Sequence, residues 1–515
     1  MKRNPFSTPF MTSLLCLLLG IQLSYAQGVV IQRSEDGRDG VKSYTSVVNF
    51  TTLEFKYKGD IKINDTDSDV TAISPGGFIK IEKTTFGNTR SIYLEGDSDG
   101  RIIREYFEGK SKVDYEPNGK RFLNDVLLEV IRAAGFDAEG RTQRIYARGG
   151  LESVLNEIDE IPSNRVMAIY YQAMFDKKGL SKEELKATVA HVGEAMSSNS
   201  EMGRLLRNNA ALFMSDENLS IAFFKAVDQM SSNSEMGATL RHAMKGNLSP
   251  QAQIALLNTV NGMSSNSEMG ATLRQFSEIQ GLHGAASDAY FATIDGMSSN
   301  SEVGSVLRNL IKKQNLDAKT YARLFASVAQ MSSNTEAGSV LRLAASRMPQ
   351  SPAVYEGYFK ALQSLTSNTE TASVLESFIS SHPLNEANAK AYFGTVRQMS
   401  SNSAMGQALR DVADKINNQK ALVEDYNETV KRLSSSSEAG ASLRSFIKHN
   451  HEEYSLVVAL AAASYLSSNS EKGAVLSEAA PYIPKGQNKA REAYKTTANS
   501  LSSDSEYRRA MQALE

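Results

Sequence analysis

Hydrophobic positions in the C-terminal two-thirds of the chain recur with a period of about 34 residues, which is typical of a stacked helical-repeat array. Each copy opens on an apolar residue and continues with a polar turn, as in MSSNSEMGATLR at residues 263–274. In this copy Met269 and Leu273 lie four positions apart, so they share one face of a helix. We therefore predict that a helix begins in the polar turn of every copy.

The polar turn carries its own helix-start pattern. Ser265 and Glu268 have the S-x-x-E spacing of a capping box, in which each side chain accepts a hydrogen bond from the other residue's backbone N–H. A glycine such as Gly270 follows in most copies, although glycine costs a helix about 1 kcal/mol relative to alanine. We expect this glycine where two helices approach closely. A second apolar run, with large pairs such as Tyr290 and Phe291, precedes each turn, so each repeat is predicted to be a helical hairpin.

The N-terminal part of the chain has a different pattern. Leu53, Phe55 and Tyr57 alternate with charged residues, which predicts a half-buried strand. Residues 92–94 and 102–107 flank a Gly-Asp-Ser-Asp-Gly turn and predict a hairpin, and residues 122–134 have helical spacing. The predicted fold class is α+β and mostly α: a small antiparallel β domain with one packed helix, then an α-solenoid of about eleven hairpins, HEAT/TPR-like. The predicted boundaries are 1–26 for a leader, 27–140 for the β-rich domain and 141–515 for the solenoid, with a rigid junction.

The predicted leader has three parts. Lys2 and Arg3 precede an apolar run at residues 11–23, and the run ends in Ser24-Tyr25-Ala26, as in a cleavable secretory signal. We expect cleavage after Ala26 and a periplasmic or extracellular product. No other apolar run approaches the ~20 residues of a membrane span. The formal net charge of −2 argues against general binding of nucleic acid or anionic membranes.

Three stretches resemble a known group of proteins. They are the run FLNDVLLEVIRAAGFDAEGRTQRIYARGGLESVLNEIDEI, the ISPGG turn at residues 73–77 and the closing SSDSEYRR. Together they resemble uncharacterised bacterial envelope proteins and are similar to tails attached to β-lactam-sensing antirepressor-type membrane metallopeptidases. The resemblance implies no functional residues. The chain lacks the HExxH motif of such peptidases, because Ser455 stands where His451-Glu452 would need a second histidine.

Candidate chemistry is sparse. Asp65, Asp67 and Asp69 have the initial spacing of a calcium loop, but Val70 and Gly76 replace the required glycine and glutamate, so a solvated turn is predicted. The six histidines fall at unrelated repeat positions and are expected on the surface. The recurring serines lack a partnered base, so we interpret them as helix caps rather than nucleophiles. No catalytic residue, cofactor or metal site is predicted.

Two sets of repeat residues form a possible interaction surface. The arginines have two readings, as a basic track for an acidic ligand or as partners of a glutamate in the next repeat. The sixth repeat has Glu376 in place of arginine and the seventh has Ala404 in place of glutamate, and this joint change favours pairing. The candidate residues are Arg207, Arg241, Arg274, Arg308, Arg342, Arg410 and Arg444, with Asn199, Asn233, Asn266, Asn300 and Asn334.

The repeat array predicts an exported, non-enzymatic binding or scaffold protein. Its extended surface would hold a protein or polymer partner, with no nucleic acid and no membrane span in the mature chain. The alternative, implied by the family resemblance alone, is an accessory or sensory subunit that regulates an envelope peptidase or cell-wall enzyme.

Overall fold

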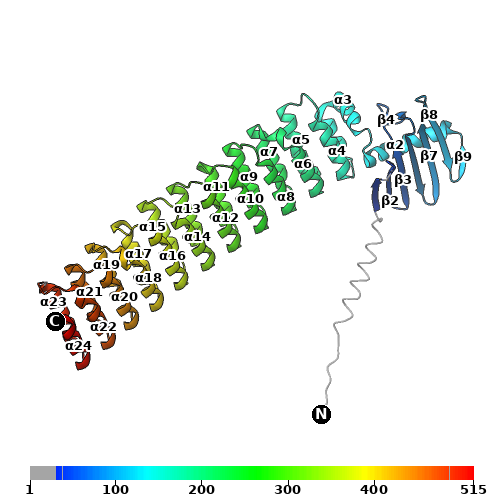
Figure 1. Ribbon diagram of the computed structural model, residues 1–515. Coiled ribbons are helices and arrows are strands. Elements are labelled where there is room, and N and C mark those ends of the chain that lie inside the picture. The colour runs from blue at the N-terminus through cyan, green and yellow to red at the C-terminus, as the bar shows by residue number, and fades with distance from the viewer. Residues whose placement is uncertain (1–30, 37–38, 487) are drawn as a thin grey trace, which may run out of the picture. The chain divides into compact units, whose positions relative to one another are not determined.

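The computed structural model describes residues 31–36, 39–486 and 488–515, so the predicted leader lies outside the described residues (Figure 1). The chain divides into two compact units. The first ends at Phe213 and also takes in Lys225–Ser231, and the second consists of Met214–Phe224 and Ser232–Glu515. A small antiparallel sheet is followed by helices α2 to α24, which confirms the predicted mostly helical α+β class.

The first unit contains a seven-stranded antiparallel sheet with the order β1-β2-β3-β6-β7-β8-β9, and β4 pairs separately with β5. The predicted strand at residues 53–57 is part of β3, and its apolar and charged residues alternate between the buried and exposed faces of the sheet. Leu53, Phe55 and Tyr57 are buried, whereas Glu54 and Lys56 between them are exposed. The strands are β1 Ile31–Asp36, β2 Lys42–Val48, β3 Thr51–Lys58, β4 Ile61–Ile63, β5 Val70–Ile73, β6 Phe78–Thr85, β7 Asn88–Gly96, β8 Ile102–Glu108 and β9 Ser111–Val113.

The helix α2 Lys120–Ala134 packs on one face of this sheet (Figure 1). Its buried side chains, among them Phe122, Leu127 and Ile131, join Leu53 and Ile81 of the sheet in one core. The predicted helix at residues 122–134 and the predicted β7–β8 hairpin are both confirmed. Strands β2 and β9 of this sheet carry no clear alternation in the sequence, so the pattern did not predict them.

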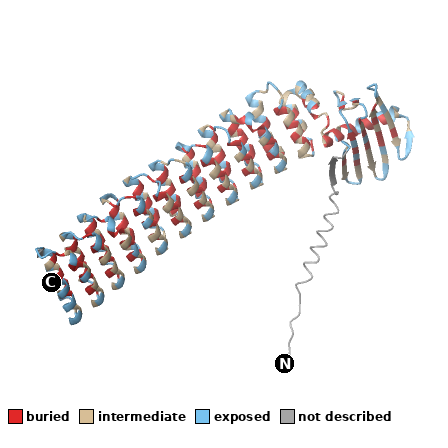
Figure 2. Cartoon of the chain, in the orientation of Figure 1, coloured by how far each residue is buried: buried red, intermediate tan, exposed pale blue. Residues whose placement is uncertain are grey.

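Helices α3 to α24 pair into eleven hairpins, as the repeat count predicted. In the second unit the odd-numbered helices form one layer and the even-numbered helices the other (Figure 1), and buried residues lie between the layers (Figure 2). No helix in the described part of the chain is long and apolar enough to cross a membrane. The bounds of the helices are α3 Ala138–Asp159, α4 Asn164–Phe175, α5 Lys182–Ala195, α6 Asn199–Met214, α7 Glu217–Asp228, α8 Asn233–Ala243, α9 Pro250–Asn261, α10 Asn266–Ile279, α11 Gly284–Asp295, α12 Asn300–Lys313, α13 Ala318–Ala329, α14 Asn334–Ala345, α15 Pro352–Leu362, α16 Asn368–Ser381, α17 Glu386–Gln398, α18 Asn402–Val412, α19 Lys420–Val430, α20 Ser436–His449, α21 Glu453–Ala463, α22 Asn469–Ala479, α23 Asn488–Asn499 and α24 Asp504–Leu514.

Candidate functional site

The asparagine of each polar turn bonds to the turn of the next repeat. Asn266 Nδ2 donates to Ser298 Oγ at 3.0 Å, and its Oδ1 accepts from the backbone N–H of Ser298 at 2.9 Å and of Ser299 at 3.1 Å. One side chain thus satisfies two N–H groups that precede a helix, which the helix itself cannot do. We call this series the asparagine ladder. It includes the five candidate residues Asn199, Asn233, Asn266, Asn300 and Asn334, and continues through Asn368 and Asn402.

The candidate arginines of the second unit pair with the glutamate of the next repeat, which is the reading that the sequence favoured. Arg308 Nη1 lies 2.7 Å from Glu336 Oε2, and about a quarter of each side chain is exposed. Half-buried pairs of this kind are less screened by solvent than fully exposed ones. Arg207 lies on α6 and is half-buried. The six pairs, called here the arginine–glutamate ladder, are Arg241–Glu268, Arg274–Glu302, Arg308–Glu336, Arg342–Glu370, Arg410–Glu438 and Arg444–Glu471.

The recurring glycine makes room for this ladder. A Cβ atom placed on Gly304 would lie 2.5 Å from Glu336 Oε2 and 3.0 Å from Arg308 Nη1. The same two neighbours, a glutamate of the next repeat and an arginine of the same helix, surround Gly338. The expected close approach of two helices is therefore wrong in detail. It is a carboxylate, and not the backbone of a neighbouring helix, that occupies the space beside the glycine.

The ladder is interrupted at one place, where three residues change together. Glu376 stands at the arginine position, Ala404 replaces the glutamate that would face it, and Ala372 replaces the glycine. With no carboxylate to accommodate, the Cβ of Ala372 has no conflict. Burial raises the pKa of the nearby Asp411 carboxyl, with the charge of Glu376 adding to the effect.

The polar turn starts a helix as predicted, but the capping box is only half present. Ser299 Oγ accepts a hydrogen bond from the backbone N–H of Glu302 at 3.4 Å, so the serine is the N-cap. The Glu302 carboxylate does not return the bond to Ser299, because it pairs with Arg274 of the preceding repeat. The backbone N–H of Ser299 is bonded instead by Asn266. The predicted capping box joined the Glu302 carboxylate to the Ser299 N–H. In the structure the carboxylate belongs to the arginine–glutamate ladder and the N–H to the asparagine ladder.

The three aspartates considered as a calcium loop contact arginines. Asp67 Oδ2 lies 2.8 Å from Arg141 Nε, and Asp69 Oδ1 lies 2.7 Å from Arg104 Nη1. The predicted solvated turn is therefore right only for Asp65, whose side chain is 79% exposed. Among the described residues no group of three or more His, Cys, Asp or Glu side chains is arranged to hold a metal ion.

Arg141 links this loop to α3 and α4. Arg141 is only 3% exposed, and its Nη1 donates to Glu157 Oε1 at 2.7 Å and to the Tyr170 hydroxyl at 2.9 Å. Arg132 of α2 donates to both carboxylate oxygens of Glu157. Burial alone raises the pKa of Glu157, but the bonds from Arg132 and Arg141 outweigh it and hold that pKa below its usual value. These charged side chains connect α2 and the β4–β5 loop to α3 and α4 of the first hairpin.

The histidines are less uniform than expected. His382 is buried, with Nε2 bonded to the Ala345 carbonyl at 2.7 Å and Nδ1 3.2 Å from the Tyr355 hydroxyl. Burial lowers the pKa of His382, and the bond to Ala345 opposes this effect. The prediction of surface histidines is wrong for this residue, because the repeat position it occupies faces the core.

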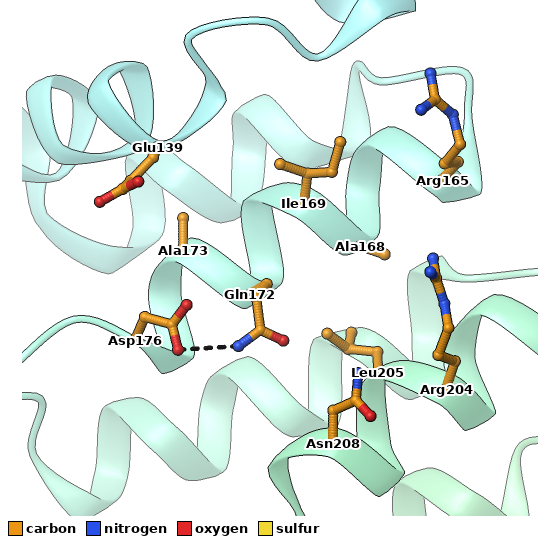
Figure 3. Close-up of a pocket in the computed structure, with 10 residues that line it drawn as sticks. All are labelled: Glu139, Arg165, Ala168, Ile169, Gln172, Ala173, Asp176, Arg204, Leu205 and Asn208. Carbon is orange, nitrogen blue, oxygen red and sulfur yellow. Dashed lines mark hydrogen bonds between the residues drawn. The ribbon is translucent and has the colours of Figure 1, made fainter. Parts of the chain in front are cut away.

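A hollow of about 460 Å³ lies on the first unit, between α4, α6 and the start of α3 (Figure 3). Arg165 and Arg204 stand on one side of it, and Glu139 and Asp176 on the other (Figure 3). Gln172 lies between them and donates to Asp176 Oδ1 at 2.9 Å. We call this hollow the charged groove. Its separated charges suit a ligand segment that carries an anionic and a cationic group.

The groove forms where the first repeats depart from the repeat pattern. Gln172 occupies the position that later repeats give to the ladder arginine, so Glu201 has no such partner and pairs with Arg204 of its own helix. Gln172 instead exchanges hydrogen bonds with Asn209 of α6. This site was not predicted from the sequence, although Gln172 at the arginine position of the repeat was visible there.

No protein-family model matches the chain, and no curated protein matches its sequence.

Proposed function

We propose that the protein is an exported, non-enzymatic binding or scaffold protein that holds a protein or an extended polymer. One observation carries this proposal. The polar groups of the repeat signature bond to neighbouring repeats, so the recurring chemistry builds an array of fixed spacing. A stack of this kind presents an extended surface, which helical-repeat proteins use for binding.

We place the first contact with the partner at the charged groove. Its lining side chains are not part of the two ladders, and Arg165, Asp176 and Asn208 present functional groups at its surface. A protein segment of mixed charge can pair with both sides at once. Polar complementarity of this kind fixes the orientation and register of a partner more than it raises affinity.

The test is a photo-crosslinking pull-down from the native envelope. A photoreactive residue at Asn208 should capture one discrete partner, whereas the same residue at His242, the equivalent position of the next repeat, should capture less of it. Reversing the groove charges with Arg165→Glu and Arg204→Glu should abolish capture. Lys319→Glu with Lys390→Glu changes the net charge equally on exposed positions outside the groove and should leave capture intact.

Each outcome bears on a separate statement. Equal capture by the groove variant and its control contradicts the assignment of the groove. Failure of the unaltered protein to capture any partner contradicts the binding function. Recovery of a peptidase or cell-wall enzyme favours the accessory-subunit alternative.

A further inference from the structure

Two phenylalanine rings project from neighbouring turns at one end of the sheet. Phe50 is 81% exposed and Phe86 is 75% exposed, and their ring centroids lie 5.8 Å apart in a stacked arrangement. The β2–β3 turn, Asn49-Phe50, and the β6–β7 turn, Phe86-Gly87, are adjacent because β3 pairs with β6, with Thr51 opposite Thr85. We call this pair of residues the phenylalanine tip.

Both rings occupy backbone positions that disfavour them. The two turns are two-residue loops with φ of 46° and 62° at Asn49 and Phe50, and of 50° and 81° at Phe86 and Gly87. Positive φ at both positions is the property of the type I′ turn, which strongly favours Asn-Gly. Each turn therefore keeps one favoured residue and places phenylalanine at the other position.

The two phenylalanines are unusual among the residues of this chain with positive φ. Seven described non-glycine residues have positive φ, and apart from the two phenylalanines they are all Asn or Asp, which tolerate that conformation. The rings touch each other yet remain mostly exposed, so their mutual contact buries little apolar area. Residues kept in an unfavourable conformation, with their side chains in solvent, point to a role outside the fold.

The geometry points to a lipid surface as the partner of the phenylalanine tip: we propose that Phe50 and Phe86 insert into the interfacial layer of a bilayer. Both rings are mostly exposed to solvent. Neither turn contains a charged residue, and the flanking Thr51, Thr85 and Asn88 carry hydroxyl and amide groups that can bond to lipid headgroups. Exposed apolar side chains ringed by uncharged polar groups suit the boundary between headgroups and acyl chains.

The export proposed above would bring this end of the sheet close to a membrane, so this part of the inference rests on the proposed function. Strand β1 begins at Ile31, which pairs with Val47, so the chain enters the sheet at the end that carries the tip. The predicted leader's apolar run ends at residue 23, and the eight residues from there to Ile31 span at most about 28 Å. This length of chain is the largest distance that can separate the start of the sheet from the predicted leader.

The sequence offers a direct reporter for this contact, since it contains no tryptophan. In the exported form of the full chain, Phe50→Trp should show a blue-shifted emission on addition of phosphatidylcholine vesicles and quenching by brominated acyl chains. Tyr465→Trp is the matched control, because Tyr465 is 74% exposed on the helical repeats. Its emission should not change.

A second variant separates insertion from a structural role. Phe50→Gly with Phe86→Asn gives both turns the favoured Asn-Gly sequence, so it should fold and melt at or above the temperature of the unaltered protein. Its partitioning into vesicles should fall about tenfold for each ring removed. Cosedimentation is measured with phosphatidylcholine alone and with added phosphatidylglycerol.

The proposal is overturned by any of four results: an unchanged Phe50→Trp spectrum, unchanged partitioning of the double variant, a lowered melting temperature of that variant, or binding that requires anionic lipid. A lowered melting temperature would mean that the rings stabilise the fold. A requirement for anionic lipid would mean that basic residues, not the rings, drive the contact. The proposal is independent of the partner bound by the helical repeats.

Discussion

Replacing Gly304 by alanine tests why the recurring glycine is present. The added Cβ would meet Glu336 Oε2 at 2.5 Å, so the carboxylate must move and its 2.7 Å contact with Arg308 is lost. Alanine favours the helix by about 1 kcal/mol over glycine. Loss of an ion pair of this exposure costs on the order of 0.2 to 1 kcal/mol. The two effects oppose each other, so we expect the unfolding free energy to rise by between zero and about 0.8 kcal/mol, less than helix propensity alone would give.

The same substitution behaves differently when the carboxylate is absent. In a Glu336→Ala background no carboxylate has to move, so Gly304→Ala should stabilise the protein by the full ~1 kcal/mol of helix propensity. The difference between the two backgrounds measures the coupling of the glycine to the glutamate. It is read from native-state hydrogen exchange of α12 amides, because a stacked array opens locally, with the urea midpoint as a second measure.

The interrupted rung supplies a natural control. Ala372 and Ala404 already occupy the glycine and glutamate positions of this rung, so Ala372→Gly should destabilise the protein by about 1 kcal/mol with no compensating ion pair. The reasoning is refuted if Gly304→Ala stabilises equally in both backgrounds, because the carboxylate then does not require the glycine.

Three further predictions follow from the ladders and the buried charges. Asn266→Ala removes three hydrogen bonds to the next repeat and should cost about 1 to 3 kcal/mol, seen as faster hydrogen exchange in α12; unchanged exchange would contradict the role of the asparagine ladder. Glu376→Arg with Ala404→Glu should create the missing rung only when Ala372→Gly is also present, and a double-mutant cycle in both backgrounds measures the coupling. The pKa of Glu157 is lowered in the folded state, so its ionised carboxylate stabilises the protein fully above the unfolded pKa, and this stabilisation is lost as pH falls through the lower folded pKa. The melting temperature of Glu157→Gln should therefore fall less steeply below about pH 4 than that of the unaltered protein.

Much of the fold follows from local patterns in the sequence. The 34-residue period gave the helical hairpins because apolar spacing reports which side of a helix faces the core. The alternation of Leu53 and Phe55 with charged residues gave a strand for the same reason. The ion-pair ladder was also predictable, since Glu376 and Ala404 change together and a paired contact is the simplest cause.

Other features depended on contacts between repeats. Asn266 is an ordinary turn residue by sequence, and its three bonds appear only when the next repeat is placed beside it. The turn glutamate was assigned to a capping box on the pattern of Ser265 and Glu268. In the structure Glu302 pairs with Arg274 of the preceding repeat, because a charge-assisted hydrogen bond is stronger than a bond to an uncharged backbone N–H. Gly270 was explained by helix packing, whereas the side chain of Glu302 fills that space.

The charged groove and the phenylalanine tip show the same division. The sequence shows that Gln172 departs from the repeat pattern and that Phe50 and Phe86 each lie next to a turn residue. Only the tertiary structure brings Arg165 and Arg204 to one side of a hollow and sets the two rings 5.8 Å apart. Sequence periodicity records the face that each residue presents. The atom that a side chain contacts in the next repeat or the paired strand depends on the stagger and register between the elements. These are set by the packing of the whole array.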